Sequence, residues 1–108
     1  MSNDALARLQ AQVGGPRDGA LLRFALGNAL LAAGDPAAAA REFDAALGFD
    51  PNYSAAWKLL GRACSESGDD AGAITAYTRG IAVARDRGDE QAAKEMTVFL
   101  RRLQSPSK

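Results

Sequence analysis

The sequence predicts an all-α protein of stacked helical hairpins, with about six helices in its 108 residues. The first observation is a repeat of 34 residues, in which Leu26-Gly27 returns as Leu60-Gly61 and Gly34-Asp35 returns as Gly68-Asp69. A period of this length is typical of one helical hairpin that packs on its neighbours. The second observation is that apolar residues recur at helical spacing, while the alternating pattern of strands is absent.

An N-terminal helix is predicted over residues 4–13, with Asn3 as its N-cap. Leu6 and Leu9 lie on one apolar stripe, and the run Gly14-Gly15-Pro16 ends the helix. Because the stripe is apolar, this helix needs a neighbour that covers it.

The first hairpin is predicted from a helix over residues 20–33 and a helix over residues 36–48. Gly34 ends the first helix because glycine adopts the left-handed backbone conformation at little cost. Asp35-Pro36 then supplies an N-cap and a first-turn proline for the second helix, which ends before Asp50-Pro51-Asn52.

The second hairpin repeats this pattern with helices over residues 53–67 and 70–85, and a last helix follows Gly88-Asp89. The apolar stripe of the last helix comprises Ala92, Met96, Phe99, Leu100 and Leu103. We therefore predict a single domain over residues 1–108, with an N-terminal helix (4–13), a first repeat (20–53), a second repeat (54–87) and a C-terminal capping helix (88–104).

The recurring residues resemble the tetratricopeptide repeat family, whose pattern places a Leu-Gly pair on one helix and an aromatic between small residues on the next. The matching residues are Leu26-Gly27, Leu30, Ala39, Phe43, Ala46 and Pro51 in the first unit, and Trp57, Leu60-Gly61, Cys64, Ala73, Tyr77 and Gly80 in the second. The resemblance implies antiparallel hairpins that stack as a short right-handed superhelix and bind proteins instead of catalysing a reaction.

Three departures from the family pattern carry information. Arg23 stands where the second unit has Trp57, and Arg85 stands where the first unit has Pro51. The second departure predicts that the helix over 70–85 continues by about a turn. Lys94-Glu95 stands where a third Leu-Gly pair would fall, so the last helix is interpreted as a cap.

A binding groove is predicted on the first helix of each hairpin, because in this family these helices line the concave face. Lys58, Arg62 and Ser65 form the only polar stripe of their helix, and the positions 34 residues earlier are Phe24, Asn28 and Leu31. We predict a groove with an apolar half (Leu21, Phe24, Leu31) and a cationic half (Lys58, Arg62). Ser65 lies on the same stripe as the two cations, and Asn28 is available to hold a peptide backbone. The alternative is that a terminal helix covers Phe24 and Leu31.

The predicted function is a non-catalytic protein–protein interaction module that binds a peptide or helix of a partner. No histidine is present, and the lone Cys64 lies in an apolar pattern typical of a small buried side chain. We therefore expect no catalytic residues, no metal and no cofactor. A chaperone-tail adaptor is disfavoured, because Phe24 stands where the two-carboxylate clamp of that subfamily needs a cation before Asn28, and Leu59 replaces a further asparagine.

Charge and hydropathy limit the classes of partner that the sequence favours. Thirteen basic residues balance thirteen acidic ones without a basic run, which argues against nucleic acid. No apolar segment approaches the roughly 20 residues that cross a bilayer, so we expect a cytoplasmic protein without a membrane partner. A monomer is expected. The alternative is a self-associating assembly protein that uses its terminal helices, with Met96, Phe99 and Leu103 at the interface.

Overall fold

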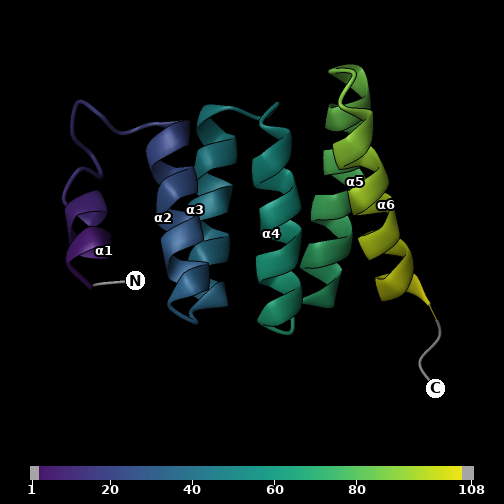
Figure 1. Cartoon of the computed structure of the whole chain (residues 1–108), viewed down its shortest axis with the longest axis horizontal. Coiled ribbons are helices and arrows are strands. Elements are labelled where there is room, and N and C mark those ends of the chain that lie inside the picture. Colours follow the sequence, from purple (N-terminus) through teal and green to yellow (C-terminus); the bar gives the residue numbers. More distant parts are fainter. Residues whose placement is uncertain (1–2, 106–108) are drawn as a thin grey trace.

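The structure, a computed structural model, describes residues 3–105 and the side chains of residues 4–105. Within that part of the chain all regular structure is α-helical, which confirms the predicted fold class (Figure 1). The helices are α1 (Asn3–Gln10), α2 (Ala20–Ala32), α3 (Pro36–Phe49), α4 (Ser54–Glu66), α5 (Asp70–Asp86) and α6 (Glu90–Gln104).

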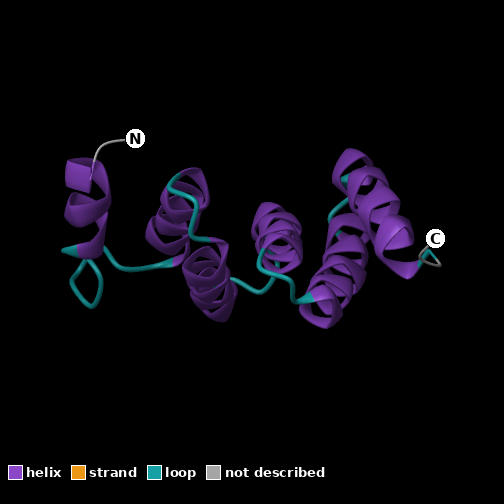
Figure 2. Ribbon diagram, turned by 90° about the horizontal axis from the view of Figure 1, so that it is seen from below, coloured by secondary structure: helices purple, strands orange, loops and turns teal. Residues whose placement is uncertain are grey.

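The helices alternate between two sides of a flat molecule with extents of 42 × 33 × 19 Å. Figure 2 shows α2, α4 and α6 following one another on one side, with α3 and α5 on the other. We call these the inner side and the outer side. Each helix packs mainly on its neighbours in sequence, while α6 packs on α5 and also contacts α4. This is the arrangement of stacked antiparallel hairpins.

The turns between helices follow the predicted chemistry. Gly34 and Gly68 adopt the left-handed conformation, with φ of 83° and 86°. The next aspartate then caps the following helix, since its carboxylate accepts a hydrogen bond from a backbone N–H of the first turn. These bonds measure 3.2 Å from Ala38 to Asp35, 2.9 Å from Gly72 to Asp69 and 3.1 Å from Ala92 to Asp89.

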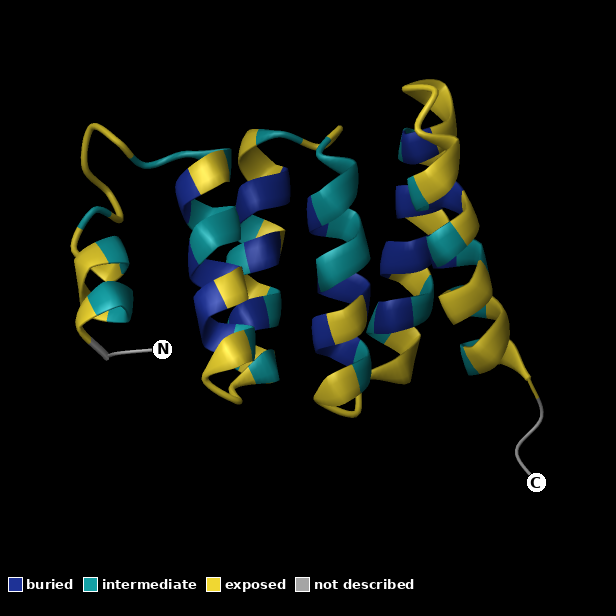
Figure 3. Ribbon diagram, in the orientation of Figure 1, coloured by how far each residue is buried: buried dark blue, intermediate teal, exposed yellow. Residues whose placement is uncertain are grey.

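Two glycine–aromatic contacts hold the hairpins together. A Cβ atom added to Gly27 would lie 2.4 Å from Cε1 of Phe43, and one added to Gly61 would lie 2.4 Å from Cε1 of Tyr77. Only a residue without a side chain lets the rings approach so closely. The core is therefore built from equivalent positions, and Figure 3 shows buried residues where neighbouring helices meet.

Two helix ends differ from a simple repeat. The predicted helix 4–13 ends at Gln10, because Gln12 and Val13 donate to the carbonyls three residues earlier as the chain tightens before Gly14. Helix α5 ends at Asp86, one residue beyond the predicted range of 70–85, and has 17 residues against 14 in α3. The Asn3 side chain, predicted as an N-cap, falls outside the part that the structure describes.

Arg23 has a structural role that the sequence did not reveal. Its guanidinium donates to both carboxylate oxygens of Asp18, at 2.9 and 3.0 Å, and to Oε1 of Glu42 at 3.1 Å. Asp18 also accepts a hydrogen bond from the backbone N–H of Gly14. This network attaches the α1–α2 loop to the first hairpin, and the side chain of Arg23 is mostly shielded from solvent.

The Asp18 network predicts an acid-dependent loss of stability. The hydrogen bonds from Arg23 and Gly14 lower the pKa of Asp18 from 3.8 to about 2. Because the folded-state value lies below the unfolded one, this stabilisation is complete above about pH 4 and is lost as the pH falls toward about 2. Denaturation at about pH 6 and about pH 2 should show a smaller acid effect in Asp18→Asn than in the wild type. Equal acid effects in the two proteins would contradict this role.

Candidate functional site

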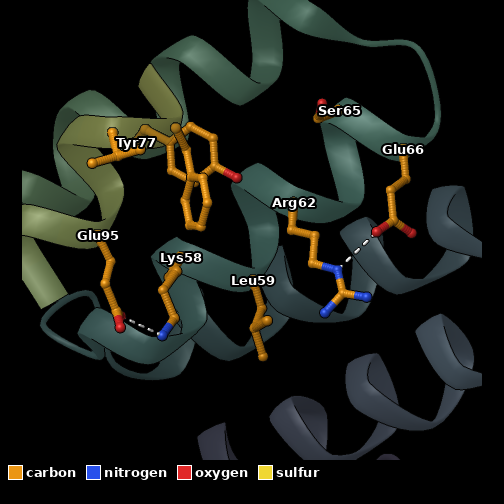
Figure 4. A pocket seen from close by; sticks show the side chains of 9 residues that line it. Lys58, Leu59, Arg62, Ser65, Glu66, Tyr77 and Glu95 are labelled. Atoms are coloured by element: carbon orange, nitrogen blue, oxygen red, sulfur yellow. Dashed lines mark hydrogen bonds and ion pairs between the residues drawn. The ribbon is translucent and has the colours of Figure 1, made fainter. Parts of the chain in front are cut away.

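A concavity lies between α4 and α6, two neighbouring helices of the inner side. It has a volume of about 700 Å³ (Figure 4). We call it the inner pocket. Its lining residues are Lys58, Leu59, Arg62, Ser65 and Glu66 of α4, Tyr77 of α5, and Glu95, Val98 and Phe99 of α6.

Both cations of the inner pocket are paired with carboxylates of the same pocket. Lys58 Nζ lies 2.9 Å from Oε1 of Glu95 and joins α4 to α6, and its hydrogen bond lowers the pKa of Glu95. Arg62 Nε lies 2.7 Å from Oε2 of Glu66, one turn further along α4. The Arg62 pair is the more exposed, and exposed pairs on one helix are weak. A ligand carboxylate therefore competes more readily for Arg62 than for Lys58.

The apolar wall of the inner pocket comes from α5 and α6. The Tyr77 and Phe99 rings pack at a centroid distance of 5.6 Å, and Phe99 and Val98 are 36% and 47% exposed. Figure 4 shows the hydroxyl end of Tyr77 directed toward the Arg62 side. Burial raises the pKa of that hydroxyl, so Tyr77 stays a neutral hydrogen-bonding group. The pocket thus combines exposed apolar surface with Arg62, whose carboxylate partner Glu66 a ligand carboxylate can replace.

The structure brings together the predicted cationic half of the groove. Lys58, Arg62 and Ser65 all line the inner pocket. The predicted apolar half lies apart from this pocket, on α2, where Asn28 is exposed and Leu31 is half-buried. Leu21 is 75% exposed at the start of α2.

Phe24 is half-buried, and two aromatic rings pack against it. Its ring stacks on Tyr53, with centroids 4.8 Å apart, and packs against Phe43 at 5.7 Å. Tyr53 precedes α4, so the loop between the hairpins partly covers this part of α2. Helix α6 contacts α4 and α5 and, within the described residues, does not reach α2.

Three further observations concern metal ligands, the cysteine and membrane-spanning helices. The described residues contain no group of three or more His, Cys, Asp or Glu side chains that could hold a metal ion. Burial, together with the carboxylates of Asp69 and Asp44, raises the pKa of the Cys64 thiol, which keeps it protonated. No described helix is both long and apolar enough to cross a membrane.

Comparisons with known proteins agree with this architecture. The sequence pattern described as Tetratricopeptide repeat matches residues 30–96. The chain is 55% identical over 86 residues to the TPR repeat-containing protein PA0015 of Pseudomonas aeruginosa, covering 80% of this chain and 82% of that protein.

Two solved structures show the same arrangement of helices. The solution structure of protein BPP2914 from Bordetella parapertussis has a TM-score of 0.78 and 46% sequence identity, covering 92% of this chain and 86% of that one. The crystal structure of PcrH in complex with the chaperone binding region of PopD has a TM-score of 0.84, covering 94% of this chain and 77% of that one. At 20% identity, the second likeness is one of fold.

Proposed function

This chain belongs to the tetratricopeptide repeat family of protein–protein interaction modules, and we propose that it binds a segment of a partner protein in the inner pocket. The observation that carries the proposal is a 700 Å³ concavity in which exposed Val98 and Phe99 face Lys58 and Arg62. A partly exposed aromatic in a concave site is a typical anchor point for a peptide side chain.

The chemistry of the pocket indicates the kind of segment that fits. An aromatic or branched aliphatic side chain would pack against Tyr77, Val98 and Phe99. A carboxylate close to that anchor would replace Glu66 as the partner of Arg62. PcrH, which has the same fold, was crystallised in complex with the chaperone binding region of PopD, so this fold accommodates a polypeptide segment.

The predicted residues of α2 extend this proposal along the inner side. Phe24, Asn28 and Leu31 precede Lys58, Arg62 and Ser65 by one repeat period, and the latter three line the inner pocket. Equivalent positions of stacked hairpins face the same side. A partner segment that extends beyond its anchoring side chain would therefore continue from the inner pocket toward Asn28 and Leu31.

Reversing the charge of Arg62 should weaken peptide binding. We would select peptides on the wild-type chain from a displayed random library and measure their affinity for Arg62→Glu and Val98→Asp. We expect the selected peptides to carry an aromatic or branched aliphatic residue next to a carboxylate. Their affinity for each variant should be about tenfold or more lower than for the wild type, equal to about 1.4 kcal/mol. Arg41→Glu, an exposed charge reversal on α3, serves as the control and should bind normally.

Two outcomes would contradict the proposal. One is a set of peptides whose affinity is unchanged by Arg62→Glu and Val98→Asp while circular dichroism shows an intact fold. The other is a mass that rises with concentration in light scattering and returns to that of the monomer in Val98→Asp. That result would assign Val98 to self-association through α6.

A further inference from the structure

A second concavity lies on the other side of α4, between α3 and α5. Its volume is about 390 Å³. We call it the outer groove. Its floor is formed by the buried residues Leu60, Cys64 and Ala76, and small residues form part of its wall. The remaining lining residues are Asp44, Trp57, Asp69, Ala71, Gly72, Thr75 and Arg79.

The indole of Trp57 forms a fixed wall of the outer groove. Its Nε1–H donates a hydrogen bond of 2.8 Å to the carbonyl of Pro51, which satisfies the polar edge of the ring. The ring is half-buried, and its remaining apolar surface lines the groove. A flat aromatic surface of this kind attracts a guanidinium or an aliphatic stem.

The charged groups at the rim lack ionic partners. Within residues 4–105, Asp44, Asp69 and Arg79 take part in no ion pair, although Asp69 accepts the N–H of Gly72 as a helix cap. Asp44 is an exposed residue, and partial loss of water at its carboxyl raises its pKa. A carboxylate in this condition is stabilised when a cation approaches it.

At the repeat position of Trp57 the first hairpin has an arginine in place of the tryptophan. Arg23 stands one period before Trp57, and its guanidinium is held by two carboxylates, those of Asp18 and Glu42. Glu42 itself stands one period before Ala76 of the outer groove. The second hairpin thus has an aromatic wall where the first has an arginine, and Ala76 stands where the first has Glu42. The carboxylates of the outer groove, Asp44 and Asp69, come from other positions of the repeat.

We propose that the outer groove binds an arginine side chain of a partner protein, with its guanidinium at Asp44 and its stem against Trp57 and Ala76. This inference goes beyond the proposed function, because it concerns the other side of α4 and a ligand of opposite charge. The two sites share no lining residue, so each proposal succeeds or fails by itself.

The chain contains a single tryptophan, so the indole N–H of Trp57 gives one assigned signal in a ¹⁵N-correlated NMR spectrum. We would titrate the whole chain at low salt with three pentapeptides that carry arginine, lysine or glutamate between glycines. We expect a saturable shift of the Trp57 signal with the arginine peptide, with a dissociation constant in about the millimolar range. The lysine peptide should bind more weakly, since it lacks the planar group that stacks on indole.

Three variants separate this site from general attraction of a basic peptide. Asp44→Asn should weaken binding of the arginine peptide about fivefold or more, and Arg79→Ala should strengthen it because a like charge is removed. Glu66→Gln removes an acid of the inner pocket and should leave binding unchanged. The proposal is overturned if the glutamate peptide shifts Trp57 equally, if Asp44→Asn binds as the wild type does, or if Glu66→Gln weakens binding as much as Asp44→Asn.

Discussion

Replacing Gly61 by leucine is expected to lower the free energy of unfolding by about 3 kcal/mol or more, because the core leaves no room for a side chain there. The first added carbon alone would lie 2.4 and 2.5 Å from two ring atoms of Tyr77. Tyr77 is only 4% exposed, so its ring has no free space to enter. Urea denaturation followed by circular dichroism measures the change.

Gly48→Leu is the matched control for the Gly61 variant. Gly48 lies in the last turn of α3, and a Cβ atom added there meets no atom within 4 Å. Because glycine is the poorer helix former, leucine at this exposed position should leave stability unchanged or raise it by up to about 1 kcal/mol. A Gly61→Leu protein that is as stable as Gly48→Leu would show that the Tyr77 contact does not constrain the fold.

The fold could be predicted because its determinants are local. Gly34 and Gly68 stop helices, and Asp35 and Asp69 start the next ones, through contacts that span only a few residues. The 34-residue period then shows which positions of the two hairpins are equivalent, and this needs no knowledge of how the hairpins pack. The assignment of residues 20–53 and 54–87 as the two repeats stays a prediction.

The inner pocket could be predicted only in part, because three of its nine lining residues lie on α6 and their position depends on how that helix packs. The polar stripe Lys58, Arg62 and Ser65 is visible from helical spacing, and it does line the pocket. Val98 and Phe99 reach the same pocket only because α6 packs on α5 and Lys58 bonds Glu95, 37 residues away. The sequence placed Phe99 on a stripe to be buried, whereas the structure leaves it 36% exposed.

Arg23 illustrates a second limit of the sequence argument. It was identified as a departure from the repeat pattern, but its partner Asp18 lies in a loop whose course no period determines. Because Arg23 stands at the position of Trp57, only the second hairpin has a tryptophan there. The two hairpins therefore differ in chemistry at this position. Departures from the repeat therefore locate the surfaces at which the two hairpins differ in their capacity to bind.

Truncation of Phe43 to alanine should cost about 3 to 5 kcal/mol, which is a large part of the stability of a domain of this size. Phe43 has no exposed surface, lies against the backbone of Gly27, and supports the ring of Phe24. Its removal leaves a cavity between α2 and α3 that the surrounding helices fill only in part. Thermal and urea denaturation should both show the loss.

Phe99→Ala provides the comparison that separates folding from binding. Because the Phe99 ring is 36% exposed and contacts the core mainly through Tyr77, its truncation should cost only about 1 to 2 kcal/mol. Peptides selected for the inner pocket should nevertheless bind this variant about tenfold more weakly, since the anchor surface is lost. A Phe99→Ala protein with normal peptide affinity would exclude this ring from the binding site, whatever its effect on stability.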